Sequence, residues 1–223
     1  MVYFSSANIT GGMRAGHTYK LGDIMNRRNT LKSLLAAALV ASSFSLPAFA
    51  AADVAGIKFD DSASVAGKDL KLNGAGLRTK FLFKVYAMGL YLQDKKTTTA
   101  DILASQGPRR VNLVMMRELT SEEFGNAFMA GLNANSDQAE RTKVLPQTMK
   151  FGEMFAQISA LKKGDVLTMD WLPGEGTQCM LNGKKIGDMV PDVAFYNAIL
   201  RIWIGDKPVD SSLKPALLGA ATK

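Results

Sequence analysis

Residues 81–92 read FLFKVYAMGLYL, and the expected architecture follows from this segment. Most of its residues are aromatic or β-favouring, and Lys84 carries its only charge. The segment is too aromatic for a surface helix, and Gly89 would weaken a buried one. We therefore predict a long, central β-strand over residues 81–92.

Other short segments with a strand-like composition lie on both sides of this central strand. They cover residues 54–59, 68–72, 111–116, 166–171 and 177–181. Asn182-Gly183 follows the last of them and is a strong signal for a two-residue hairpin turn. These segments together predict an antiparallel sheet.

Helical periodicity appears between and after the predicted strands. Thr120 and Glu123 have the spacing of a capping box, which predicts a helix from Thr120 to about residue 133. Further helices are expected at residues 100–105, from Pro146, at residues 193–203 and from Ser211. The fold class is therefore α+β: an open-faced sandwich, with an antiparallel sheet and helices packed mainly on one face.

The start of the chain has the composition of an export leader. Residues 25–50 begin with basic residues, continue through an apolar stretch and end in Ala48-Phe49-Ala50, a cleavage pattern for signal peptidase. The apolar stretch at residues 34–46 is shorter than the roughly 20 residues that a bilayer-spanning helix needs. We therefore expect a cleavable signal peptide and no membrane-spanning segment.

This leader sets the expected boundaries and location of the protein. Residues 1–24 would lie upstream of the true start, and residues 51–223 would form one domain in the periplasm. Arg27-Arg28 also resembles a twin-arginine signal, but Thr30 stands where an apolar residue is usual, which favours the general secretory route.

Composition excludes several classes of site from residues 51–223. This part holds 22 basic and 19 acidic residues, a net charge of +3, and no basic block with interleaved aromatics, so no nucleic-acid partner is expected. The only histidine, His17, lies upstream, which excludes histidine-based nucleophilic sites and the common zinc sites. Cys179 is the only cysteine and is predicted to be a buried core thiol. No metal and no cofactor are expected.

The segments around the central strand resemble the signature of the chalcone isomerase family. Asn73-Gly74-Ala75-Gly76-Leu77-Arg78 is similar to the G-x-G-x-R segment of that family, and residues 83–92 are similar to its strand ending in A-x-G-x-Y-L. Weaker similarities follow at residues 119–124, 202–206 and 211–214, in consistent order. The resemblance implies the open-faced sandwich of the family, here in a bacterial exported branch.

The plant enzyme of this family closes a chalcone to a flavanone by an intramolecular oxa-Michael reaction. The resemblance implies that Arg78 matches the arginine that holds the substrate phenolate or, in relatives that bind fatty acids, the lipid carboxylate. Tyr86 stands at the position of a catalytic threonine, and Phe124 at that of the catalytic tyrosine. A helix asparagine and a late threonine of the family fall at Gly131 and Ile202. The anion-holding arginine is thus kept, while most catalytic polar groups are replaced.

The favoured function is non-catalytic binding of a fatty-acid-like or other hydrophobic anion, because an arginine can grip a carboxylate with two hydrogen bonds. The predicted ligand-binding residues are Arg78, Tyr86, Phe124 and Ile202. The cavity walls are expected to include Phe81, Phe83, Phe124, Phe128 and Ile202.

One alternative is an isomerase or intramolecular lyase of unknown substrate, with Arg78 and Tyr86 as catalytic residues. Another is a structural or interaction protein without a ligand, whose protein partner is left open.

Structural roles compete with some of these assignments. Arg78 could instead pair with a carboxylate at the edge of the core, such as Glu118 or Asp170. Gly74 and Gly76 fit a tight turn better than a phosphate loop, because no Lys-Ser/Thr follows them.

Overall fold

The computed structural model describes residues 50–220. The predicted signal peptide at residues 25–50 lies outside this range except for Ala50, and residues 1–24 also lie outside it. Within residues 50–220, no helix is long and apolar enough to cross a bilayer.

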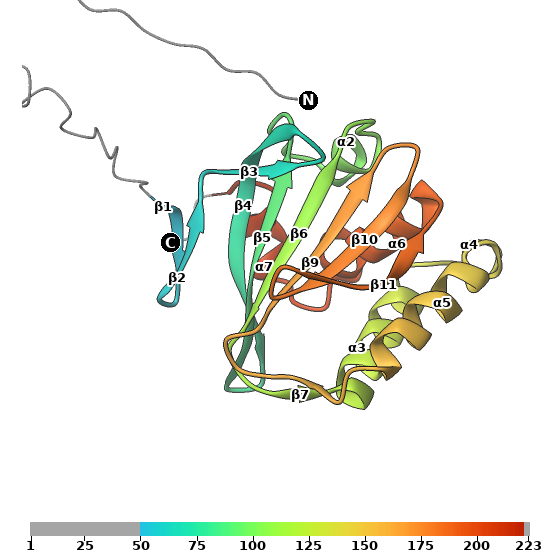
Figure 1. Cartoon of the computed structure of the whole chain (residues 1–223). Coiled ribbons are helices and arrows are strands. Elements are labelled where there is room, and N and C mark those ends of the chain that lie inside the picture. The colour runs from blue at the N-terminus through green and yellow to red at the C-terminus, as the bar shows by residue number, and fades with distance from the viewer. Residues whose placement is uncertain (1–49, 221–223) are drawn as a thin grey trace, which may run out of the picture. The chain divides into compact units, whose positions relative to one another are not determined.

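The centre of the fold is an antiparallel sheet of seven strands in the order β11-β10-β9-β6-β5-β4-β3 (Figure 1). Its strands are β3 (Ser62–Val65), β4 (Lys68–Lys80), β5 (Phe83–Leu92), β6 (Arg109–Met115), β9 (Val166–Leu172), β10 (Gly176–Leu181) and β11 (Lys184–Val190). The long strand predicted from residues 81–92 is confirmed as β5, which lies between β4 and β6 in the interior of the sheet.

Two small strand pairs lie beside the main sheet. One pair consists of β1 (Ala50–Val54) and β2 (Ile57–Asp60), and the other of β7 (Leu119–Thr120) and β8 (Ala160–Leu161). The prediction of a single strand over residues 54–59 is therefore wrong: a turn at Ala55-Gly56, where both residues have positive φ, divides this segment between β1 and β2.

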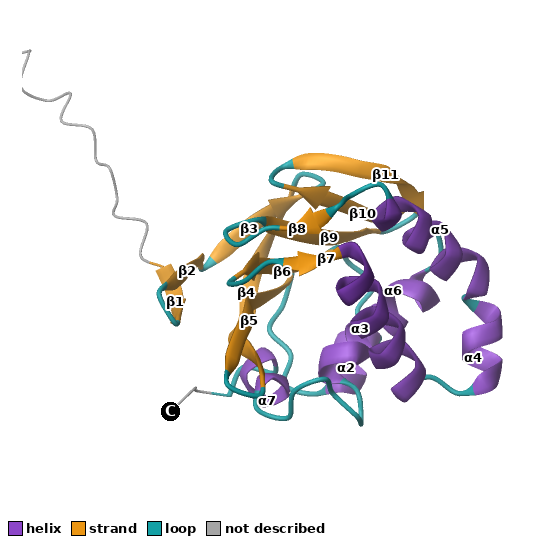
Figure 2. Ribbon diagram, turned by 90° about the horizontal axis from the view of Figure 1, so that it is seen from below, coloured by secondary structure: helices purple, strands orange, loops and turns teal. Residues whose placement is uncertain are grey.

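The helices gather on one side of the strands, as Figure 2 shows. They are α2 (Thr99–Leu103), α3 (Ser121–Ala134), α4 (Gln138–Lys143), α5 (Leu145–Ala156), α6 (Val193–Ile204) and α7 (Leu213–Leu217). Their apolar side chains and those of the facing strands form the larger hydrophobic core, which includes Cys179 as predicted. The predicted α+β open-faced sandwich is confirmed.

A smaller core covers part of the opposite face of the sheet. Phe59 of β2 and Val54 of β1 pack there with side chains of β3, β4 and β5. A Cβ added at Gly89 would lie 2.8 Å from the Phe59 ring, so the glycine that interrupts β5 allows Phe59 to lie against the strand.

Local sequence signals correctly placed several element boundaries. The Thr120 hydroxyl accepts a hydrogen bond from the Glu123 N–H at 3.1 Å, and the Glu123 carboxylate accepts one from the Thr120 N–H at 2.9 Å. This is the predicted capping box of α3. Asn182 and Gly183 have φ values of 51° and 76°, as a type I′ hairpin between β10 and β11 requires.

Gly74 and Gly76 have a different role from the predicted tight turn. Both lie inside β4, which continues well beyond the predicted end at residue 72, and α7 packs directly on them. A Cβ at Gly76 would lie 2.7 Å from Leu213 Cδ1. The glycines therefore allow a close approach between strand and helix, and the prediction of a turn is wrong.

Candidate functional site

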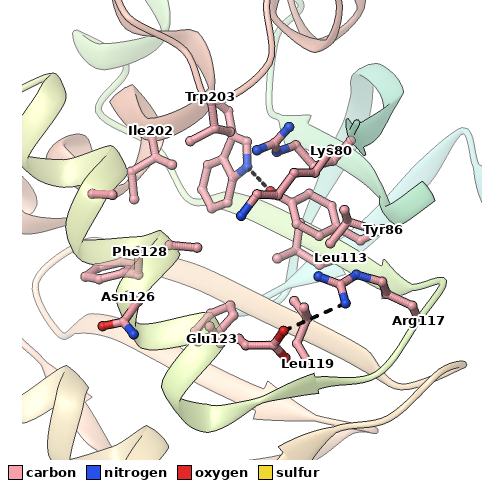
Figure 3. A pocket seen from close by; sticks show the side chains of 16 residues that line it. Lys80, Tyr86, Leu113, Arg117, Leu119, Glu123, Asn126, Phe128, Ile202 and Trp203 are labelled. Carbon is pink, nitrogen blue, oxygen red and sulfur yellow. Dashed lines mark hydrogen bonds and ion pairs between the residues drawn. The ribbon is translucent and has the colours of Figure 1, made fainter. Parts of the chain in front are cut away.

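A cavity of about 410 Å³ lies between the sheet and the helices α3 and α6 (Figure 3). The structure places all four predicted ligand-binding residues in its lining: Arg78, Tyr86, Phe124 and Ile202. Further apolar side chains in the walls are Val85, Leu113, Leu119, Phe128, Trp203 and Val209. The volume falls within the range of roughly 300–1,000 Å³ that is typical of small-molecule sites.

A β-bulge explains how two consecutive residues of β5 reach the same cavity. Arg78 pairs with Tyr86 and Thr79 pairs with Lys84, which leaves Val85 as an extra residue in β5. Side chains normally alternate between the two faces of a strand, but a bulge interrupts this alternation. Val85 and Tyr86 can therefore both line the cavity.

The cavity carries more positive than negative side chains. Arg78 and Lys80, two positions apart in β4, both line it, as does Arg117 from the segment between β6 and β7. Glu123, at the start of α3, is the carboxylate in the lining, and its Oε1 lies 3.9 Å from Arg117 Nη1. Figure 3 shows this pair at one side of the cavity.

Arg78 also has a carboxylate neighbour, but not one of those predicted. Its Nη1 lies 3.6 Å from Asp210 Oδ2, and both side chains are largely buried. The expected partners Glu118 and Asp170 are therefore wrong, because the segment after α6 brings Asp210 to β4, and Asp170 pairs with Arg110 instead. Arg78 and Asp210 lie far apart in the sequence, so no local pattern predicted this contact.

Hydrogen bonds hold Asp210 in its ionised form. Its carboxylate accepts bonds from the Thr79 N–H at 3.0 Å, the Ser212 hydroxyl at 2.7 Å and the Ser212 N–H at 2.9 Å. Burial alone would raise the pKa of Asp210, but these donors and Arg78 together hold it below its usual value. The Asp210 carboxylate is thus ionised at neutral pH.

Tyr86 is a neutral phenol in this site. Its hydroxyl accepts a hydrogen bond from Trp203 Nε1 at 2.7 Å, drawn as a dashed line in Figure 3. Burial raises the pKa of Tyr86, whereas the hydrogen bond from Trp203 and the charge of Arg78 lower it. Burial has the larger effect, so the pKa lies above its ordinary value. A group with such a pKa is poorly matched to proton transfer near pH 7.

Apolar residues and a glycine stand where the family has polar catalytic groups, and they are closely packed. Phe124 stacks on Phe155 of α5, with ring centroids 4.7 Å apart. A Cβ at Gly131 would lie 2.7 Å from Ile202 Cγ2, so α3 and α6 leave no space for a larger side chain there. Phe124 and Gly131 therefore bring no proton-transfer group to the cavity.

Two predicted wall residues are not in the cavity. Phe81 is 88% exposed and Phe83 is 67% exposed, so their assignment to the lining is wrong. Both lie at or beside the turn of the β4–β5 hairpin, and this end of β5 is exposed. Phe128, also predicted, does line the cavity.

Lys80, Arg117 and Trp203 line the cavity although the sequence did not predict them. Strand alternation could have indicated Lys80, since it follows Arg78 by two positions. Arg117 and Trp203 come from other elements, and no local pattern links them to β4. Among the described residues, no group of His, Cys, Asp and Glu is placed to hold a metal ion.

Comparison with known proteins agrees with this fold. A family model described as chalcone isomerase-like matches residues 51–219. A solved structure of a fatty-acid binding protein from Arabidopsis thaliana superposes with a TM-score of 0.56 at 17% sequence identity, covering 74% of this chain and 92% of that chain. A search of curated proteins returned no match.

Proposed function

Since the chain belongs to the chalcone isomerase-like family, we propose that it binds a fatty-acid-like or other hydrophobic anion without transforming it. The ligand's acidic head would lie at Arg78, and its apolar part would lie against Phe124, Phe128 and Ile202. The observation that carries this proposal is a largely buried guanidinium in the wall of a mainly apolar cavity of about 410 Å³.

The charges around Arg78 support an anionic head group. A guanidinium has five N–H donors, and Asp210 lies at 3.6 Å, beyond hydrogen-bonding distance, so donors remain for a second carboxylate. Lys80 adds positive charge to the lining, where the charges of Arg117 and Glu123 offset each other. The cavity as a whole thus favours an anion over a neutral or cationic ligand.

The polar groups support binding rather than turnover. Phe124 has no hydroxyl, Gly131 has no side chain, and Tyr86 is held as a neutral phenol by burial. General acid or base assistance is typically worth about 10²–10⁴ in rate, and these residues do not supply it. The structural neighbour is itself a fatty-acid binding protein, which agrees with this proposal.

The substitution Arg78→Ala is expected to weaken binding of a fluorescent fatty acid by about 10- to 100-fold. A hydrogen bond to a charged group is worth roughly 1.5–3 kcal/mol, which corresponds to this range. A fluorescence titration measures the dissociation constant. Arg141→Ala, on α4 and outside the cavity lining, is the matched control and should bind like wild type. Equal affinity of the wild type and Arg78→Ala, both with native circular dichroism, would contradict the proposal.

We also propose that residues 25–50 are removed on export and that the domain works in the periplasm. The basic start, the short apolar stretch and the Ala48-Phe49-Ala50 pattern support this, and the family match begins at residue 51. Amino-terminal sequencing of the protein recovered from the periplasmic fraction is expected to begin at Ala51. A protein that keeps residues 25–50 and stays in the cytoplasm would refute it.

A further inference from the structure

The turn of the β4–β5 hairpin carries large apolar side chains into solvent. Phe81 is 88% exposed, Leu82 is 94% exposed and Phe83 is 67% exposed. We call these three residues the hairpin tip. Figure 1 shows β4 and β5 running to the end of the sheet where β7 lies. A cluster of exposed aromatic and aliphatic residues indicates an interaction surface.

The geometry of the turn does not explain these residues. Lys80 pairs with Phe83, so Phe81 and Leu82 form a two-residue turn, and Phe81 has a φ of +56°. Glycine is the usual residue at the first position of a type II′ turn, where φ is positive, and a phenylalanine there is strained. The residues of the hairpin tip are thus unfavourable both in a tight turn and in contact with water. Such a departure is expected where residues serve a function.

Two lysines, Lys80 and Lys84, flank the hairpin tip in the chain. No acidic residue occurs between Asp69 and Asp94. An apolar tip with a lysine on either side suits a lipid interface, because apolar side chains enter the acyl boundary while lysines contact anionic headgroups.

We propose that the hairpin tip docks this protein onto a bilayer surface that contains anionic lipids. Phe81, Leu82 and Phe83 enter the interface, and Lys80 and Lys84 contact the headgroups. Because Lys80 belongs to both the hairpin and the cavity lining, docking brings the cavity next to the membrane. Exchange of a bound hydrophobic anion with the bilayer would follow, and that last step rests on the proposed function.

The size of the hairpin tip favours a bilayer over a second copy of the chain. Large aromatic side chains bury about 150–250 Å² each, so Phe81 and Phe83, with the smaller Leu82, together offer on the order of 500 Å². A stable protein interface needs roughly 800 Å² from each partner. A lipid interface has no such threshold, because it accepts a few inserted side chains together with basic ones.

The test compares vesicle co-sedimentation of the wild type with a variant that carries Phe81→Gly and Leu82→Asn. Gly-Asn suits the turn, so this variant should fold with an unchanged or higher melting temperature. On vesicles of phosphatidylcholine with phosphatidylglycerol, its partition coefficient is expected to fall at least about tenfold. Any contribution from residues 1–49 is common to both proteins, so the difference reports on the hairpin tip.

Two further variants test the contributions of charge and of the cavity to vesicle binding separately from that of the hairpin tip. Lys84→Gln is expected to weaken binding to anionic vesicles by about fivefold and to leave binding to pure phosphatidylcholine vesicles unchanged. Arg78→Ala should keep vesicle binding even where it loses the fatty acid, so the two proposals can fail separately. Equal sedimentation of the wild type and the double variant would overturn membrane docking. A wild-type dimer in light scattering that the double variant lacks would overturn it in favour of self-association.

Discussion

Gly74→Ala is expected to lower the free energy of unfolding by about 3 kcal/mol. The added Cβ would lie 2.0 Å from the Ala216 carbonyl oxygen and 3.0 Å from the Leu217 carbonyl carbon, so α7 or β4 must move. Overpacking typically costs about 1–3 kcal/mol, and the upper end applies because backbone atoms meet the new methyl group. Urea denaturation followed by circular dichroism measures the change.

Gly152→Ala in α5 is the matched control for this substitution. Its Cβ would meet nothing within 4 Å, so the same chemical change should stabilise the protein by about 0.5–1 kcal/mol through helix propensity. A loss at Gly74 no larger than the change at Gly152 would show that α7 does not pack tightly on β4. Opposite signs are expected.

The loss at Gly74 should also reach the cavity. Helix α7 follows directly after Asp210 and Ser212. The Asp210 carboxylate accepts hydrogen bonds from the Thr79 N–H of β4 and from the Ser212 N–H, which holds the segment after α6 against β4. A displaced α7 would therefore disturb the position of Asp210 beside Arg78. Ligand affinity in Gly74→Ala should fall together with stability.

Asp170→Ala is expected to cost about 3–5 kcal/mol of unfolding free energy. Arg110 on β6 donates to its carboxylate through Nε at 2.7 Å and Nη2 at 2.6 Å, and the Asp170 side chain is 5% exposed. Removing the carboxylate leaves a largely buried guanidinium without its partner, and breaking a buried pair in this way costs several kcal/mol. The midpoints of thermal unfolding and of urea unfolding measure the loss of stability.

Two further variants show whether the cost comes from the unpaired charge. Asp188→Ala removes a carboxylate that is 90% exposed and 4.0 Å from Lys150, and this should change stability by less than about 0.5 kcal/mol. Combining Asp170→Ala with Arg110→Met removes both charges and should recover part of the loss. A double variant no more stable than Asp170→Ala would mean that the cost is not the buried charge.

The long hydrophobic segment was enough to place the centre of the sheet. Residues 83–92 pair with β4 on one side and β6 on the other, and strand residues on both faces are buried, which agrees with the near-continuous apolar sequence. The position of the turn at Phe81-Leu82 was not predictable, because neither residue is a turn former. Phe81 and Phe83, at the exposed end of this segment, were for that reason assigned to the cavity.

The candidate site was found residue by residue through the family resemblance rather than through periodicity. The resemblance placed Arg78, Tyr86, Phe124 and Ile202, and the structure brings all four to one cavity. Lys80, Arg117 and Trp203 also line this cavity. Local patterns gave no means of finding Arg117 and Trp203, because their place in the cavity depends on how β6, α3 and α6 pack.

The sequence by itself determined features whose causes lie within a few residues: the capping box of Thr120 and Glu123, the hairpin turn at Asn182-Gly183 and the extended run of β5. Only the tertiary structure decided that Asp210, and not Asp170, accompanies Arg78. It also decided that Gly74 faces α7 and that Phe81 faces solvent. The physical reason is the same in each case. Hydrogen bonds of caps and turns are local, whereas charge pairing, close backbone approach and exposure depend on segments far apart in the chain.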